Sequence, residues 1–170
     1  MFRRFKTAER KTGVVASQAL ARGTPAPNFG LTSTTGDKVA PSDFRGRPLV
    51  LVFYPADFSS VCGDQLALSN EVLPLFEAHK AQVLAISVDG IWCHRAFSEQ
   101  HHLRFPLLSD FEPKGAVAQS YGVFDASQGL NKRALFVIDA QGVIRWSHVS
   151  PSEVNPGADG ILKALASLEV

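Results

Sequence analysis

The chain has 170 residues, which leaves room for one domain of ordinary size and little more. Hydrophobic residues make up 45% and charged residues 19%, and no apolar run approaches the length of a membrane span, so we expect a water-soluble, cytoplasmic protein with no membrane partner. The net charge of +1 combines +4 over residues 1–11, from five basic residues and one glutamate, with −3 over residues 12–170. Such an acidic body does not favour nucleic-acid binding.

The basic N-terminus differs from the rest of the chain. Residues 1–22 are predicted to be a flexible basic extension, followed by a single domain at residues 23–170. A secretory signal peptide would need an unbroken apolar core, and Ser17 and Gln18 interrupt the apolar stretch GVVASQALA. Inside the domain, Gly36-Asp37 between two short extended pieces predicts a hairpin turn.

The segment 48–54, PLVLVFY, is a continuous apolar run that ends at Pro55. This pattern predicts a strand buried on both faces. The helix expected next should be kinked or split by Pro74, and the run 82–89, QVLAISVD, predicts a second buried strand. Because residues 48–89 are enough for a parallel crossover, the sheet is predicted to be at least partly parallel.

The rest of the chain continues the alternation of helices and strands. The remaining predicted elements are helices at 91–102, 112–122 and 158–170, a strand at 105–110, and a hairpin of strands at 134–139 and 143–149. Together the elements predict a mixed α/β sandwich, with helices on both faces of a sheet that has one antiparallel flank.

Cys62 stands where the first buried strand is predicted to turn into a helix. If Ser59 is the N-cap, Cys62 is the third helical residue, where unpaired backbone N–H groups and the helix dipole favour a thiolate. The helix end typically contributes only about 0.3 to 1 kcal/mol, so a cation is needed as well. The candidates are Arg45, Arg47, Arg133 and Arg145. The alternative is that Cys62 is a buried structural thiol.

The spacing of Pro55, Ser59 and Cys62 in PADFSSVC resembles the PxxxTxxC active-site motif of the peroxiredoxins, with serine in place of the commoner threonine. Other segments resemble that family in the same order: APNF, FRGRPLVLVFYPA, ISVD, FPLLSD, YGVF and RALFVIDAQGVI. The resemblance covers about residues 23–168 and is nearest to the bacterioferritin-comigratory type and the related one-cysteine group. It implies a thioredoxin-like α/β fold, a three-layer sandwich with a central mixed β-sheet and helices on both faces.

The resemblance also implies a role for each matching residue. Cys62 would be the peroxidatic cysteine, which attacks a hydroperoxide as a thiolate and becomes a sulfenic acid. Ser59 would hydrogen-bond the peroxide, Pro55 would shield the sulfenate from water, and Arg133 would favour the thiolate and polarise the peroxide. Without the resemblance, Ser59 is only a helix cap, Pro55 a strand terminator and Arg133 a surface charge. The family often has glutamate three residues after the cysteine, where this chain has Gln65.

Cys93 lies in the predicted helix 91–102 beside His94, which we expect to be an exposed residue. Some relatives of the bacterioferritin-comigratory type have a resolving cysteine in this helix. The resemblance therefore implies an intramolecular Cys62–Cys93 disulfide, formed after the first turn around Cys62 unwinds. The alternative is a one-cysteine cycle, in which Cys93 is a bystander and an external thiol reduces Cys62.

The sequence thus predicts a thiol-dependent peroxidase that reduces hydrogen peroxide or small organic hydroperoxides. We expect it to be recycled by thioredoxin or a similar dithiol, to need no metal, flavin or heme, and to be a monomer or weak dimer. A thiol-disulfide oxidoreductase on the same fold is disfavoured, because no CxxC cysteine follows Cys62. A noncatalytic redox sensor stays open, and it would oxidise once and stop.

Overall fold

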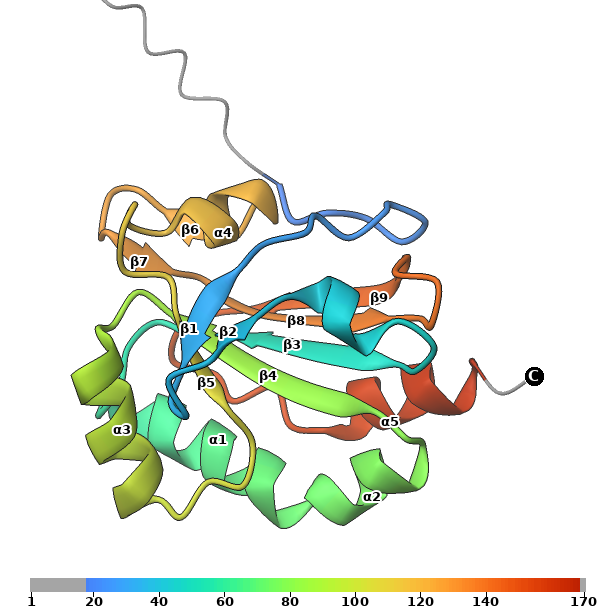
Figure 1. The fold of residues 1–170 in the computed structure, drawn as a ribbon, viewed down its shortest axis with the longest axis horizontal. Helices are drawn as coiled ribbons and strands as arrows, with labels where there is room; N and C mark the ends of the chain where they lie inside the picture. Colours follow the sequence, from blue (N-terminus) through green and yellow to red (C-terminus); the bar gives the residue numbers. More distant parts are fainter. Residues whose placement is uncertain (1–17, 169–170) are drawn as a thin grey trace, which may run out of the picture.

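A seven-stranded mixed sheet forms the centre of the computed structural model, which describes residues 18–168 (Figure 1). The strand order is β2-β1-β5-β4-β3-β8-β9. These strands are β1 (Leu31–Ser33), β2 (Lys38–Val39), β3 (Leu49–Phe53), β4 (Gln82–Ser87), β5 (Leu107–Ser109), β8 (Arg133–Ile138) and β9 (Ile144–Ser150). Strand β3 pairs in parallel with β4 and antiparallel with β8, which confirms the predicted parallel crossover and antiparallel flank.

Two hydrophobic cores lie on opposite faces of the sheet, because successive side chains of a strand point to opposite sides. In β3, Val50 and Val52 belong to one core, whereas Leu49, Leu51 and Phe53 belong to the other. This division explains why the apolar run of β3 is continuous rather than alternating.

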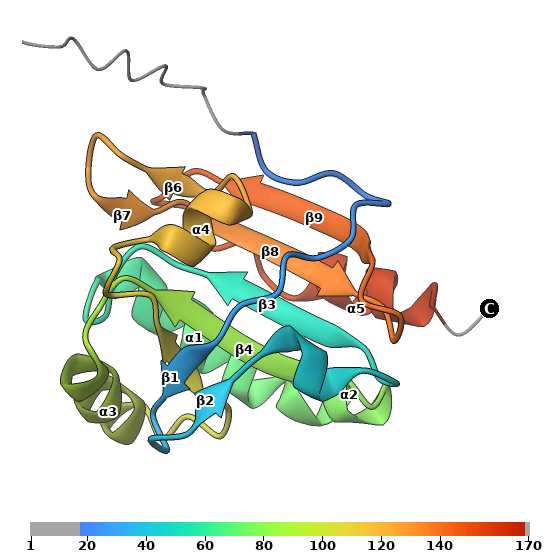
Figure 2. The ribbon, with the colours of Figure 1, turned by 45° about the horizontal axis from the view of Figure 1, so that its top comes forward.

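Helices cover both faces and complete the three layers (Figure 2). Four of them contribute to the first core: α1 (Ser60–Glu71), α2 (Leu73–Ala78), α3 (Ile91–Gln100) and α5 (Asp159–Ala166). Helix α4 (Ala116–Ser120) contributes to the second core. The predicted three-layer sandwich with a central mixed sheet is therefore confirmed.

Pro74 splits the predicted long helix as expected. Helix α1 ends at Glu71, Val72 joins the two helices, and Pro74 is the second residue of α2. Proline has no backbone N–H for the i to i−4 bond, so it is tolerated in a first turn and not in a helix interior.

Four short elements differ from the sequence prediction. The hairpin of β6 (Phe124–Asp125) and β7 (Leu130–Asn131) and the 3-10 helix η1 (Pro41–Phe44) were not predicted, because two to four residues carry no periodic pattern. Helix α4 is also much shorter than the predicted 112–122. Its N-cap, Gly115, is left-handed with φ 66°, so the helix begins only after it.

The predicted extension is only partly described, because residues 1–17 lie outside the described residues. Residues 18–22 lie against the domain, where the Leu20 N–H donates to the Tyr121 carbonyl at 3.1 Å. The domain boundary at residue 22 stays a prediction. Between residues 18 and 168, none of the helices combines the length and apolar character that a bilayer crossing requires.

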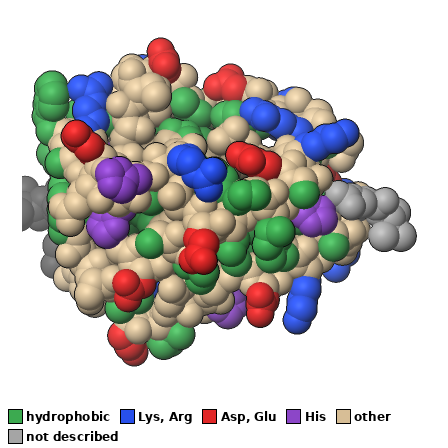
Figure 3. Space-filling view, turned by 90° about the horizontal axis from the view of Figure 1, so that it is seen from below, with side chains coloured by type: hydrophobic (Ala, Val, Ile, Leu, Met, Phe, Trp, Pro, Cys, Tyr) green, Lys and Arg blue, Asp and Glu red, His purple; other side chains and the backbone are tan. Residues whose placement is uncertain are grey.

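Acidic and basic side chains are interspersed on the face seen from below, between scattered hydrophobic ones (Figure 3). This face therefore carries no continuous patch of positive charge of the kind that binds nucleic acid.

Candidate active site

Cys62 lies in the first turn of α1, as the sequence predicts. Ser59 is the N-cap, with extended backbone angles (φ −74°, ψ 141°), and the Gly63 N–H donates to the Ser59 carbonyl at 2.9 Å. Cys62 is therefore the third helical residue, among backbone N–H groups that have no partner within the helix. These groups and the helix dipole favour negative charge on the sulfur.

Arg133 is the one arginine of the four candidates that contacts this sulfur. Its Nη2 lies 3.4 Å from Cys62 Sγ. Arg133 begins β8, which runs antiparallel to β3, and the chain leaves the adjacent end of β3 toward Cys62. The other candidates bond elsewhere: Arg45 to the Gln141 carbonyl, Arg47 to the Gln82 side chain and Arg145 to the Asp139 carboxylate.

The Arg133 guanidinium is buried, with 1% of the residue exposed, and its other partners are neutral. Nη1 donates to Gln65 Oε1 at 2.5 Å, and Nε and Nη2 donate to the Ser152 carbonyl at 3.0 and 2.6 Å. No carboxylate among residues 18–168 pairs with it. Because an unpaired buried charge is costly, a thiolate at Cys62 is the counter-ion that this arrangement favours.

Gln65 holds the position where the resemblance leads one to expect glutamate. It is 2% exposed, and its Nε2 has no partner among the described residues. The neutral amide accepts a hydrogen bond from Arg133 without neutralising its charge. More of the positive charge is thus left to act on Cys62.

Ser59 and Pro55 flank the same site. The Ser59 side chain makes no capping bond and the residue is exposed, so its hydroxyl is not used by the helix. Pro55 and Arg133 line a small cavity of about 130 Å³, together with Ser152. Cys62 is 0% exposed and does not line this cavity, so a peroxide reaches the sulfur only if neighbouring side chains move.

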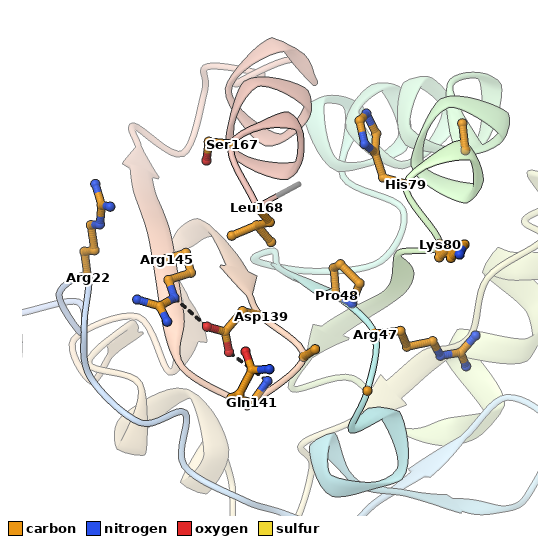
Figure 4. A pocket seen from close by; sticks show the side chains of 13 residues that line it. Arg22, Arg47, Pro48, His79, Lys80, Asp139, Gln141, Arg145, Ser167 and Leu168 are labelled. Atoms are coloured by element: carbon orange, nitrogen blue, oxygen red, sulfur yellow. Dashed lines mark hydrogen bonds and ion pairs between the residues drawn. The ribbon is translucent and has the colours of Figure 1, made fainter. Parts of the chain in front are cut away.

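A larger hollow of about 650 Å³ lies at the other end of the strands (Figure 4). Pro48, just before β3, and Asp139, just after β8, line this hollow, whereas Pro55 and Arg133 mark the opposite ends of the same strands. Two of the rejected cation candidates, Arg47 and Arg145, line the larger hollow, but Pro55, Ser59, Cys62, Cys93 and Arg133 do not.

Comparisons with known proteins identify the family. The model of the AhpC/TSA family matches residues 22–147. The chain belongs to this family. It is 40% identical over 134 residues to alkyl hydroperoxide reductase E of Mycobacterium tuberculosis, covering 78% of this chain and 88% of that protein. It is 33% identical over 138 residues to a thioredoxin peroxidase of Echinococcus granulosus, covering 77% and 70%.

A solved structure shows the same relationship. The crystal structure of peroxidoxin BcpB from Mycobacterium tuberculosis is 31% identical, with a TM-score of 0.75 and coverage of 87% of this chain and 96% of that one. The resemblance to the peroxiredoxins is therefore confirmed, and the protein is a thiol-dependent peroxidase.

In this AhpC/TSA protein, Cys93 lies near the start of α3 beside two carboxylates. Desolvation, a hydrogen bond to Asp57 and the charges of Asp57 and Asp89 raise the pKa of the Cys93 thiol to about 12. Cys93 is therefore protonated at neutral pH. Both cysteines are free in this structure.

His94 is a correction to the sequence analysis, which expected an exposed residue. It is 0% exposed, and its Nδ1 lies 2.8 Å from Asp57 Oδ2. Asp57 belongs to the loop between Pro55 and Ser59, and sequence reasoning passed over it. The one available hint was its place inside the PxxxS motif.

Asp57, Asp89 and Cys93 bring one ligand atom each to within 4.8 Å of one another, a spacing that could hold a metal ion. Hydrogen bonds already occupy the cluster, since Asp57 accepts from Tyr54 and Asp89 Oδ2 accepts from the Ser87 hydroxyl. The raised pKa of Cys93 also keeps a proton on the sulfur. These three residues fit a hydrogen-bonded cluster better than a set of metal ligands.

Proposed function

We propose that Cys62 is the peroxidatic cysteine of this peroxidase. The observation that carries the proposal is the buried Arg133 guanidinium, 3.4 Å from Cys62 Sγ and with neutral partners otherwise. A thiolate is both the nucleophile and the missing counter-ion.

The reaction proceeds by attack of the Cys62 thiolate on the terminal peroxide oxygen. An S–O bond forms as the O–O bond breaks, and the departing hydroxide or alkoxide takes up a proton. The peroxide gains two electrons and Cys62 becomes a sulfenic acid. Arg133, the Ser59 hydroxyl and the N–H groups at the start of α1 hold the two oxygens and stabilise the developing charge, and Pro55 shields the product from water.

Hydrogen peroxide and small organic hydroperoxides are the substrates we propose. The cavity of about 130 Å³ that Pro55 and Arg133 line adjoins the site and has room only for a small molecule. A relative is named an alkyl hydroperoxide reductase, which supports organic hydroperoxides as a class.

We propose Cys93 as the resolving cysteine, which attacks the Cys62 sulfenic acid, expels water and leaves a disulfide. For this step Cys93 must leave Asp57 and Asp89, because its pKa of about 12 keeps it protonated where it lies. Unwinding of the first turn of α1 would bring Cys62 toward it. Thioredoxin or a similar dithiol would then reduce the disulfide, and the name of one relative, thioredoxin peroxidase, supports this reductant.

The raised pKa of Cys93 favours a second candidate, a one-cysteine cycle in which an external thiol reduces Cys62 directly. Peptide mass spectrometry after one equivalent of hydrogen peroxide distinguishes the two cycles. A Cys62–Cys93 linked peptide supports resolution by Cys93, and a stable Cys62 sulfenic acid with unmodified Cys93 supports the one-cysteine cycle.

Two free cysteines fit a reducing compartment, so we place the protein in the cytoplasm. The monomer or weak dimer stays a prediction, as does the expectation of no nucleic-acid partner.

Steady-state peroxide consumption with a dithiol reductant tests the proposed function. We expect many turnovers per protein molecule for the native chain and none above background for Cys62→Ser. A single turnover followed by arrest would instead indicate a redox sensor. Turnover by Cys62→Ser at the native rate would remove the assignment of Cys62.

A further inference from the structure

A buried hydrogen-bonded cluster of Tyr54, Asp57 and His94 lies under the loop that leads to Cys62. The Tyr54 hydroxyl donates to Asp57 Oδ1 at 2.7 Å, and His94 Nδ1 lies 2.8 Å from Asp57 Oδ2. Tyr54 and His94 are 0% exposed and Asp57 is 8% exposed. The reaction described above uses none of these three side chains.

Both ring nitrogens of His94 lie within hydrogen-bond distance of an oxygen. Nε2 lies 3.1 Å from the Leu108 carbonyl, which only accepts, and Nδ1 faces the Asp57 carboxylate. With a proton on each ring nitrogen, Nδ1 donates to Asp57 and Nε2 donates to the Leu108 carbonyl, and His94 and Asp57 are then a buried ion pair. The Tyr54 hydroxyl donates to the second carboxylate oxygen.

The backbone of Asp57 is anchored as well. Its N–H donates to Asp89 Oδ2 at 2.9 Å, and the same oxygen accepts from the Ser87 hydroxyl at 2.6 Å. The Cys93 sulfur lies within 4.8 Å of an oxygen of each of these two carboxylates. Asp57 is thus hydrogen-bonded to Tyr54 just after β3, to Asp89 just after β4 and to His94 in α3.

Phe58, the next residue, shows why such anchoring is needed. It has a left-handed backbone with φ 59°, an outlier for a bulky side chain that persists only where surrounding contacts enforce it. On one side are the fixed side chain and N–H of Asp57, and on the other is Ser59, the N-cap. The Phe58 ring also packs edge-on against Phe97, with 5.1 Å between ring centroids.

We propose that Asp57, held by Tyr54 and His94, is a positioning residue of the peroxidase site. Its bonds keep Phe58 left-handed, and this sets where α1 begins and where the Ser59 hydroxyl lies relative to the Cys62 sulfur. This inference rests on the proposed function of Cys62. Asp57 touches no reacting atom and acts through Ser59 and the first turn of α1.

Asp57→Asn tests the proposal, because it preserves shape but removes the negative charge and replaces one of the two oxygens that face Tyr54 and His94 with an NH2 group. The matched control is Asp64→Asn, which removes the same charge from an exposed residue two positions after Cys62. Two rate constants are measured for Cys62 at one pH: oxidation by hydrogen peroxide and alkylation by iodoacetamide. Both reagents need access and a thiolate, but only the peroxide needs the Ser59 geometry.

We expect the ratio of oxidation to alkylation to fall about 10- to 100-fold in Asp57→Asn and to stay unchanged in Asp64→Asn. Tyr54→Phe removes one hydroxyl and preserves the packing, and it should lower the ratio in the same direction by a smaller factor. Nitrogen chemical shifts of His94 should indicate protons on both nitrogens in the native chain and on one in Asp57→Asn.

Three outcomes overturn the proposal: an unchanged ratio in both cluster variants, an equal fall in the Asp64→Asn control, or a singly protonated His94 in the native chain. If native Cys62 does not react with hydrogen peroxide at all, the proposed function fails instead. The two failures are therefore distinguishable.

Discussion

A buried arginine whose other partners are neutral is an unusual neighbour for a thiol. Arg133 donates to Gln65 and to the Ser152 carbonyl, and neither carries charge. The positive charge therefore remains available to Cys62 and, during the reaction, to the peroxide oxygens. The main effect of substituting Arg133 should therefore be on the reactivity of Cys62.

Arg133→Gln should lower the rate constant for Cys62 alkylation at pH 7 by about 10- to 100-fold, because it removes the charged hydrogen-bond donor at the sulfur. A hydrogen bond to a charged group is worth about 1.5 to 3 kcal/mol, and about 1.4 kcal/mol is a factor of ten. Arg47→Gln removes an arginine that bonds elsewhere and serves as the control. The measurement is the iodoacetamide rate constant at pH 7, and a native rate constant in Arg133→Gln would assign the stabilisation of the thiolate to another cation.

Ser59→Ala should slow Cys62 oxidation by roughly tenfold, a loss on the scale of one hydrogen bond to a charged transition state. The Ser59 side chain makes no capping bond, so the free energy of unfolding should change by less than about 0.5 kcal/mol. Stopped-flow peroxide kinetics and urea denaturation measure the two quantities. Ser60→Ala is the matched control, and a large loss of stability with native kinetics would make Ser59 only a cap.

The sequence predicts only part of the site, and contacts between distant residues explain the difference. Pro55, Ser59 and Cys62 lie within eight residues, so their motif is visible in the chain. Arg133 could be chosen among four arginines only through the family resemblance, because its contact with Cys62 depends on β3 pairing with β8. The buried pair of Asp57 and His94 depends on how α3 lies against the loop, which no local pattern reveals.

At the scale of elements, the β8–β9 hairpin carries Arg133 at one end and Asp139 at its turn. Burial alone would raise the pKa of the Asp139 carboxyl. Bonds from the Val143 N–H, the Arg145 guanidinium and the Gln141 N–H outweigh this effect, so its pKa is lowered. A carboxyl with a lowered folded-state pKa stabilises the fold above its unfolded pKa of about 3.9 and loses this effect as pH falls through the folded value.

Asp139→Asn should therefore destabilise the protein at pH 7 by about 1 kcal/mol, and the difference should vanish as the pH falls well below 4. Urea denaturation of both proteins at several pH values measures this. Asp37→Asn, in the turn between β1 and β2, is a control for the loss of charge. A difference that persists or grows in acid would contradict the assigned role of the carboxylate.

Long and continuous patterns predict the elements well, and short ones do not. The apolar runs predicted as strands form β3 and β4. Pro74 divides the predicted long helix into α1 and α2. Helix α4 was overestimated because Gly115 takes a left-handed conformation that the pattern of apolar residues does not disclose. Two-residue strands such as β6 and β7 form only because neighbouring segments hold them together.

At the scale of the whole molecule, the two ends of the central strands β3 and β8 carry different sets of side chains. The end where β3 runs out and β8 begins gathers Pro55, Cys62 and Arg133, and the opposite end carries the larger hollow. The larger cavity lies at the end of the strands that is far from Cys62 and Arg133. The chemistry of the side chains, and not the volume of a cavity, locates the reaction.

The most direct measurement is the fate of one equivalent of hydrogen peroxide, followed by trapping of sulfenic acid with dimedone and by peptide mass spectrometry. The account predicts that the first oxidation product appears at Cys62 within seconds, as a trapped sulfenic acid or a Cys62–Cys93 disulfide, and that Cys62→Ser yields neither. Peroxide left unconsumed, or oxidation that begins at Cys93 with Cys62 unmodified, would contradict it.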